Sequence, residues 1–226
     1  MPRPRLPERR RLLVAAARDL ALAQGWPSTT IAQIAARAGV GKGAVYLEFP
    51  DRHALLDAVL TAAMHDLTSA VHRRCLDHPG LLDLPAVYRI GLEELLDEPL
   101  LRALHLGDGD VLGEHVREVG PVRYRARIDW LGQYIADLQD AGVLARDVDR
   151  DVLGRVLGMF TLGLLSAPTA LGRITDEELR ESVALFAQLV GRGLAPAQQA
   201  DPEAARAAQL ALLDRLTDQL RTQEQP

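Results

Sequence analysis

The 226-residue chain is poor in the residues from which several classes of protein are built. Its single cysteine, Cys75, cannot form an intramolecular disulfide and has no second thiol for a zinc site. We expect it to be a half-buried helical residue rather than a reactive one. Aromatic residues make up 4% of the chain, and alternating β-branched and aromatic runs are almost absent, so β-strands have little support.

Signs of an enzyme or of a membrane protein are missing as well. No two of the six histidines stand three or four residues apart, as they would on a metal-binding helix face, so we expect neither metal nor cofactor. Acidic pairs such as Glu93-Glu94 are typical of solvated helix faces. The basic N-terminus lacks a purely apolar continuation, and the most apolar stretch, 152–168, is interrupted by Arg155 and is short for a membrane span. We therefore expect a soluble, cytoplasmic protein that is not an enzyme.

What the chain does contain is helix-forming residues and an uneven distribution of charge. Hydrophobic residues make up 48%, enough for a core, and Ala, Leu and Arg are frequent. Residues 1–53 carry nine basic and four acidic side chains, a net charge of +5, which leaves −10 for the remainder because the whole chain carries −5. A basic head on an acidic body indicates a polyanion partner at one end, although a solvated terminal arm would carry the same charge.

The N-terminal segment begins with two predicted helices. Apolar residues at three- and four-residue spacing give 8–24 one apolar face, and Gly25 ends this helix. A shorter helix begins at Thr30, whose hydroxyl and the side chain of Gln33 fit a reciprocal capping box, and it stops at Gly39.

A third helix follows after a glycine turn. The turn is 39–41, and the helix runs from about Gly41 to Leu47. Two short helices joined in this way form a helix-turn-helix, whose second helix enters the major groove of DNA. The small residues Gly43 and Ala44 would allow close approach to base edges, and the helix N-termini present free amides to phosphate. A helical corner in a globin-like or bundle protein is the alternative.

Residues 29–49, TTIAQIAARAGVGKGAVYLEF, resemble the pattern TT-x-x-x-I-A-x-x-A-G-V-S-K-G-T-L-Y-x-H-F of the TetR family of transcriptional regulators. Residues 51–56, DRHALL, are similar to the family's S-K-E-x-L-L at the start of its fourth helix. The match covers about residues 10–60, and its many fixed offsets make it more specific than a generic helix-turn-helix. It implies an all-α protein with a helix-turn-helix DNA-binding domain at 1–53, a helical ligand-binding and dimerisation domain at 54–195, and a linker with a C-terminal helical extension at 196–226.

The resemblance also implies which residues touch DNA. Lys42 would lie near phosphate or a guanine edge, Ala44 near a thymine methyl group, and the Tyr46 hydroxyl on a phosphate. Arg52 would hold the DNA backbone at the start of the fourth helix. The full implied set is Thr30, Gln33, Gly41, Lys42, Gly43, Ala44, Tyr46 and Arg52.

Four positions depart from the family pattern. Gly41 replaces a serine and so removes an N-cap hydroxyl that is typically worth about 1 kcal/mol. Ala44 replaces a threonine, and Ala21 replaces a phenylalanine whose volume Trp26 could fill. Glu48 replaces a histidine or an aromatic residue. Because a carboxylate near phosphate is repulsive, we expect Glu48 either to turn away or to accept a hydrogen bond from a cytosine amine.

Beyond residue 50, caps and breakers predict further helices at 51–78, 85–96, 98–106, 110–119, 121–141, 149–167 and 175–193, with a last one from Pro202 to about Arg221. Helices 149–167 and 175–193 are apolar over much of their circumference. Burial within a monomer would explain this, as would a dimer seam, and the resemblance favours a homodimer. The last helix could pack on the body, pack on a partner, or fray, and we expect it to pack on the body.

The resemblance implies a pocket for a small-molecule effector among the middle helices. Arg127, with Arg123 and Tyr124, could meet an anionic ligand, although arginines on a long helix are usually solvated. Ordinary core packing is the alternative for the other candidates. The candidates are Tyr88, Leu104, Arg127, Trp130, Tyr134, Met159 and Phe160.

The function expected from all of this is a repressor that binds a palindromic operator in double-stranded DNA as a homodimer and is released by a small molecule. The alternative is a helical protein-interaction or structural module that binds no specific DNA.

Overall fold

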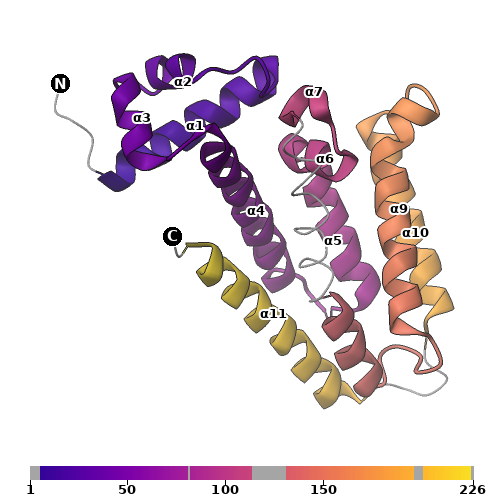
Figure 1. The fold of residues 1–226 in the computed structure, drawn as a ribbon. Helices are drawn as coiled ribbons and strands as arrows, with labels where there is room; N and C mark the ends of the chain where they lie inside the picture. Colours follow the sequence, from indigo (N-terminus) through magenta and orange to yellow (C-terminus); the bar gives the residue numbers. More distant parts are fainter. Residues whose placement is uncertain (1–5, 81, 114–130, 196–200, 225–226) are drawn as a thin grey trace. The chain divides into compact units, whose positions relative to one another are not determined.

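A computed structural model describes residues 6–80, 82–113, 131–195 and 201–224, and every regular element among them is an α-helix (Figure 1). The expected all-α class is therefore confirmed. The chain divides into two compact units, Met1–Asp66 with Pro99–Gly120, and Leu67–Glu98 with Pro121–Pro226. The helix α4 (Arg52–Leu76) is continuous from the first unit into the second. The first unit is thus larger than the predicted DNA-binding domain, 1–53.

The first unit opens with the three predicted helices, α1 (Leu6–Gln24) and the short α2 (Ile31–Arg37) and α3 (Lys42–Glu48). The capping box before α2 is confirmed. The backbone N–H of Gln33 donates to Thr30 Oγ1 at 3.3 Å, and the backbone N–H of Thr30 donates to Gln33 Oε1 at 2.8 Å. Gly39 turns the chain with φ +69°, a conformation that favours glycine. Gly41 then begins α3 without a side-chain cap, as its lack of a hydroxyl predicts.

The core of this unit is built from the apolar faces of these helices. Both Ala21 and Trp26 are buried, at 1% and 2% exposure, which is consistent with the indole filling volume that the alanine leaves. Asp51 caps α4, since its carboxylate accepts a hydrogen bond from the Ala54 amide at 2.8 Å. The other buried residues here include Leu13, Ala17, Ile34, Val45, Phe49, Leu55 and Leu56.

Two later helices, α6 (Pro99–Leu106) and α7 (Gly109–Leu112), belong to the same unit. The Trp26 amide donates to the Val111 carbonyl at 2.7 Å, so α7 is joined to the turn between α1 and α2. The helix predicted at 110–119 is wrong in its length, because Gly113, with φ +76°, ends it after Leu112. The remainder of that prediction lies outside the described residues.

The second unit contains α5 (Leu84–Leu96), helical residues 131–140, α9 (Arg150–Ala170), α10 (Asp176–Gly193) and α11 (Pro202–Glu224). α11 contributes Leu212 and Leu216 to the core of this unit, and Arg215 pairs with Asp137 at 2.5 Å. The expectation that the last helix packs on the body is therefore confirmed. Cys75 lies in the same core at 0% exposure, so it is fully rather than half buried, and burial raises the pKa of its thiol to about 11.

α9 is longer than predicted, because it continues through Pro168 to Ala170. Pro168 has no backbone N–H, so this turn of α9 lacks the hydrogen bond that another residue would donate to the preceding turn. α4 and α9 are both long and apolar enough, by length and composition, to cross a membrane, a test that the core helices of soluble proteins also pass. In this structure both contribute residues to a packed core: Val71 and Cys75 from α4, Leu153 and Leu157 from α9.

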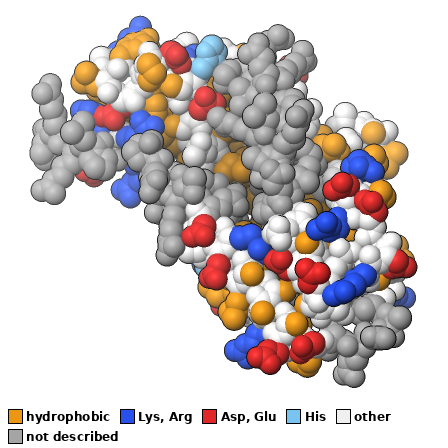
Figure 2. All heavy atoms as spheres, turned by 60° about the horizontal axis from the view of Figure 1, so that its bottom comes forward, with side chains coloured by type: hydrophobic (Ala, Val, Ile, Leu, Met, Phe, Trp, Pro, Cys, Tyr) orange, Lys and Arg blue, Asp and Glu red, His pale blue; other side chains and the backbone are white. Residues whose placement is uncertain are grey.

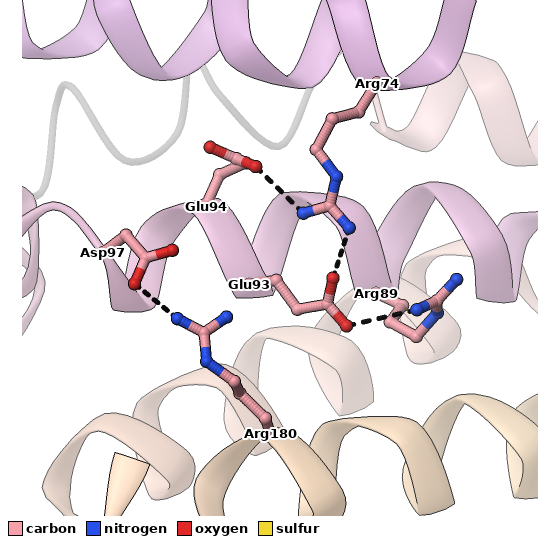
Figure 3. Close-up of polar contacts among 6 residues, drawn as sticks. All are labelled: Arg74, Arg89, Glu93, Glu94, Asp97 and Arg180. Atoms are coloured by element: carbon pink, nitrogen blue, oxygen red, sulfur yellow. Dashed lines mark hydrogen bonds and ion pairs between the residues drawn. The ribbon is translucent and has the colours of Figure 1, made fainter. Parts of the chain in front are cut away.

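A network of ion pairs joins three helices of the second unit (Figure 3). Arg74 of α4 binds two neighbouring carboxylates of α5, Glu93 and, at 2.9 Å, Glu94. Burial lowers the pKa of the Arg74 guanidinium, but its hydrogen bonds to these two carboxylates outweigh burial and raise it. Directly after α5, its C-cap residue Asp97 pairs with Arg180 of α10. Elsewhere on the face of this unit seen in Figure 2, acidic and basic side chains are interspersed rather than gathered by sign.

Candidate nucleic-acid interface

The outward face of α3 is the surface that the helix-turn-helix presents. Its inner side is fixed by Val45, 1% exposed, and by Phe49 just beyond the helix, 2% exposed. On the outer side, Tyr46 is 53% and Leu47 is 77% exposed, and Lys42 is exposed at the start of the helix. An exposed helix that is anchored by its opposite face is the geometry needed for insertion into a major groove.

Of the predicted contacts on α2, Thr30 and Gln33 are both exposed but are already engaged with each other. Gln33 Oε1 accepts from the Thr30 amide and lies 2.8 Å from the Thr30 hydroxyl. The carboxamide oxygen of Gln33 is thereby committed to the cap, so the group that it can offer to phosphate is its NH₂. The predicted pair lies together at the N-terminus of α2, where free amides also favour an anion.

Glu48 turns away from the outer face of α3. Its carboxylate pairs with Arg9 of α1, whose Nε lies 2.8 Å from Oε1, and both side chains are largely buried at 15% and 10% exposure. Arg10 donates to the Glu48 carbonyl at 3.0 Å, and its guanidinium lies 4.4 Å from the centre of the Phe49 ring. Of the two expectations for Glu48, the structure matches the first, and the negative charge is neutralised within the protein.

Arg9 and Arg10 therefore position α3, a role that the sequence did not reveal. They stand 39 and 38 residues from Glu48, and no local pattern pairs residues at that distance. Their place on α1, directly before its apolar face, made them look like part of a basic arm.

Arg52 has a different immediate partner from the one predicted. Its guanidinium stacks 4.8 Å from the centre of the Trp26 indole and donates a hydrogen bond to the Trp26 carbonyl. Burial lowers the pKa of this guanidinium. Arg52 thus ties the start of α4 to the turn after α1, and its contact with the DNA backbone stays a prediction.

The charges among residues 1–53 that are not neutralised by ion pairs within the first unit are the ones that can act on a polyanion. Asp19 is paired with Arg37 at 2.7 Å, and Glu48 is paired with Arg9. Two of the four acidic side chains among residues 1–53 are therefore neutralised by arginines of the same unit. Lys42 remains exposed on α3, where a phosphate would meet it.

Two of the predicted ligand-pocket residues come together in the second unit. Tyr88 of α5 and Phe160 of α9 have ring centres 6.5 Å apart, and the Tyr88 hydroxyl donates to the Leu157 carbonyl at 2.5 Å. Phe186 of α10, which the sequence analysis did not select, stacks on Phe160 at 3.6 Å. Its place in the apolar stripe of 175–193 was visible, but its partner was not.

The other predicted ligand residues are dispersed. Tyr134 is fully buried in the core of the second unit and donates to the Leu82 carbonyl at 3.1 Å. Met159 is 67% exposed on α9, and Leu104 is buried in the first unit. Arg127 and Trp130 lie outside the described residues, as do Arg123 and Tyr124.

Two hollows open on the second unit, and none of the described candidate ligand residues lines either of them. One, of about 530 Å³, lies between α5 and α10 and is lined by residues that include Pro85, Arg89 and Gln188. The other, of about 540 Å³, is bordered by Gln139 and Arg146. Among the described residues, no three His, Cys, Asp or Glu side chains are grouped so that they could hold a metal ion.

Residues 13–59 match the family model described as bacterial regulatory proteins, tetR family. The uncharacterised HTH-type transcriptional regulator TtgW of Pseudomonas putida is 43% identical over 60 residues, which are 26% of this chain and 45% of TtgW. The matched part of the chain thus spans less than half the length of this relative.

Solved structures resemble the chain over most of its length. A candidate TetR-family transcriptional regulator from Rhodococcus sp. has a TM-score of 0.65 at 21% identity, with 82% of this chain and 99% of that chain covered. Another candidate, from Syntrophomonas wolfei str. Goettingen, has a TM-score of 0.65 at 20% identity, with 86% and 100% covered. Likeness at such identity is evidence of fold, whereas the match over residues 13–59 is one of sequence. Residues 13–59 thus match the tetR family of bacterial regulatory proteins in sequence, within a fold that solved TetR-like structures share.

Proposed function

We propose that this protein is a DNA-binding transcriptional regulator that binds double-stranded operator DNA through α2 and α3. The observation that carries the proposal is the outward face of α3, which is exposed over Lys42, Tyr46 and Leu47 while its opposite face is anchored in the first unit. The pairing of Glu48 with Arg9 supports it, because the carboxylate that would repel phosphate is held inward.

The residues proposed to contact DNA lie at the N-termini of α2, α3 and α4 and on the outward face of α3. Lys42 supplies charge, the Tyr46 hydroxyl donates to phosphate, and the glycines allow close approach of the backbone. The set is Thr30, Gln33, Gly41, Lys42, Gly43, Ala44, Tyr46 and Arg52.

The protein is proposed to bind as a homodimer through α9 and α10. α9 leaves Val152, Val156 and Met159 exposed at a spacing of four and three residues, so they form one stripe. α10 leaves Leu185 and Leu189 exposed, four residues apart. A four-helix interface between two copies would bury the apolar stripes of both helices. The two DNA-binding domains of such a dimer would then bind the two halves of a palindromic operator.

The regulation proposed is repression that a small molecule relieves in the cytoplasm. The effector would bind the second unit, with Tyr88 and Phe160 as the candidates that lie together. It relieves repression only if it binds the DNA-competent and DNA-incompetent states with different affinity. α4 is shared by both units, so a change at its C-terminal end can reach its N-terminal end.

The test is selection of DNA from a random pool with the purified protein, followed by measurement of affinity against salt for the selected site. We expect a palindromic site and a logarithm of affinity that falls linearly with the logarithm of salt. Lys42→Ala should reduce that slope by about 1 per half-site, and Tyr46→Phe should weaken binding to all sequences alike. No enriched site, together with no salt dependence, would overturn the proposal and favour a protein-interaction module.

A further inference from the structure

Leu47 is an apolar side chain on the surface proposed to face DNA. It is 77% exposed on α3, whereas the neighbouring Val45 and Glu48 are held inward. A single exposed leucine is common on protein surfaces and by itself needs no explanation. What distinguishes Leu47 is its location four residues after Gly43, on the same side of the helix.

Gly43 leaves space beside this leucine. Apart from its two chain neighbours and the local helix backbone, no heavy atom of the described residues lies within 4 Å of where a Cβ of Gly43 would be. Next to Lys42 and Tyr46, the outer face of α3 therefore has an open position at Gly43 on the same side as the isobutyl group of Leu47. Ala44, the residue expected to meet a thymine methyl group, is half-buried and its side chain is a single carbon long.

We propose that Leu47 is a specificity-determining residue that recognises the C5-methyl group of a thymine in each operator half-site, with Gly43 leaving room for the base edge. The inference rests on the proposed function. Leucine offers no hydrogen bond, and in the major groove only thymine among the four bases offers an apolar group. Set against adenine, guanine or cytosine, the same side chain would cover donors or acceptors without pairing them, which is unfavourable.

The charge around Leu47 is suited to this occupant. Lys42 is exposed at the other end of the same helix, and residues 1–53 carry a net charge of +5. A leucine within a positively charged surface is suited to an anionic partner that carries methyl groups, which describes thymine-containing DNA better than it describes an apolar protein surface.

The test is a double-mutant cycle between protein and DNA on the selected operator. Each thymine is replaced in turn, in both half-sites, by deoxyuridine, which lacks only the methyl group. We expect one symmetric pair of positions at which the wild-type protein loses affinity by roughly 4-fold per half-site, the value of one buried methyl group. Leu47→Ala should lose at least as much and should then be indifferent to deoxyuridine at that pair alone.

Two variants serve as controls. Leu22→Ala removes an exposed leucine of α1, 41% exposed, and should change neither affinity nor the response to deoxyuridine. Leu47→Met keeps an apolar side chain and should retain the response. Because Leu47 is exposed and uncharged, Leu47→Ala should leave the melting temperature and the salt dependence as they are in the wild type.

The outcomes separate the two hypotheses. If the wild-type protein selects no site, the proposed function fails first. If it selects a site but Leu47→Ala binds that site normally, or loses affinity additively with every deoxyuridine, this inference is wrong while the proposed function stands.

Discussion

At Gly43, a substitution that stabilises the fold should weaken DNA binding. Glycine within a helix is less stable than alanine by about 0.5–1 kcal/mol, and the described residues leave open space for a methyl group at this position. Gly43→Ala should therefore raise the free energy of unfolding by up to about 1 kcal/mol. It should also weaken DNA binding several-fold, because the added methyl group keeps the backbone of α3 away from the bases.

Urea unfolding and DNA titration measure the two effects. Gly132→Ala is the matched control, since Gly132 is also helical and has similarly open surroundings among the described residues, but lies in the second unit. It should stabilise the protein and leave DNA affinity unchanged. Unchanged affinity in Gly43→Ala would mean that this face of α3 does not approach DNA.

Glu48 should matter for folding and not for DNA. Its carboxylate and Arg9 are both largely buried, so Glu48→Gln removes a charge that Arg9 needs and should lower the free energy of unfolding by about 1–3 kcal/mol. DNA affinity, measured at a temperature where the variant is folded, should change little. A marked rise in affinity with a steeper salt dependence would instead place the carboxylate next to phosphate.

The residues that the sequence predicted correctly are those whose partners are local. Thr30 and Gln33, three residues apart, form the predicted capping box. Arg9 with Glu48, and Phe160 with Phe186, pair across 39 and 26 residues, and those pairings depend on how helices pack. The family pattern fixes the offsets of a DNA-contact set, which stays a prediction, whereas no comparable pattern exists for a ligand site.

At the scale of elements, α7 is held to the turn between α1 and α2 by contacts that allow a paired test. Gly25 has φ +77°, and a Cβ there would lie 2.5 Å from the Asp110 carbonyl oxygen. Gly39 has a similar φ of +69°, but no described heavy atom beyond its chain neighbours lies within 4 Å of its Cβ position. Both Gly25→Ala and Gly39→Ala place an alanine in the left-handed conformation, which destabilises the folded state by about 1–2 kcal/mol. Only Gly25→Ala also displaces α7.

Thermal unfolding of the two variants should therefore separate the cost of backbone conformation from the contribution of α7 docking. We expect Gly25→Ala to have the lower melting temperature, with faster hydrogen exchange at the Trp26 amide, which loses its Val111 acceptor. Equal melting temperatures and equal exchange would show that α7 adds nothing to the stability of the turn.

The ion pairs of Figure 3 differ in burial, and their contributions should differ accordingly. Arg74 pairs with Glu93 and Glu94, whose side chains are 14% and 21% exposed, so Arg74→Ala removes a partner from both carboxylates and leaves Glu93 with only Arg89, 3.2 Å away. The expected loss is about 1–3 kcal/mol in the free energy of unfolding. Arg180→Ala breaks a pair in which Asp97 is 62% exposed and should cost less than about 1 kcal/mol.

Urea unfolding of both variants at low and high salt checks this expectation. At high salt, Arg180→Ala should no longer lower the free energy of unfolding, because its exposed ion pair is screened. The loss caused by Arg74→Ala should persist, because the partners of Arg74 are shielded from solvent. Equal losses would mean that burial does not control the strength of this network.

Over the whole molecule, the order of helices was predictable from caps and glycines, and the expected packing of α11 on the body is confirmed by Leu212 and Leu216 in the core. Gly113 and Pro168 were misjudged in opposite ways: Gly113 ends α7 early, while α9 continues through Pro168. A glycine or proline favours the end of a helix, but tertiary packing determines whether the helix ends there. The compact units were not foreseeable either, because α6 and α7 join the first unit although they follow α5 in sequence.

The apolar stripes of α9 and α10 test the proposed assembly. Val156, 46% exposed, and Leu189, 56% exposed, belong to them, so a charge there leaves the fold of one chain intact. In a dimer seam the same charge is buried without a partner, which is strongly unfavourable. The double variant Val156→Glu/Leu189→Glu should therefore be monomeric by sedimentation, with unchanged helical content.

Loss of the dimer should separate specific from non-specific DNA binding. Because a monomer reads one half-site, affinity for the selected palindrome should fall at least ~100-fold, while weak salt-dependent binding to any DNA remains, since the head keeps its charge. Leu210→Glu, at a leucine of α11 that is 54% exposed, is the matched control and should stay dimeric with full affinity. A double variant that remained dimeric would move the interface away from α9 and α10, and one that was monomeric yet bound the palindrome fully would show that the two heads need no shared seam.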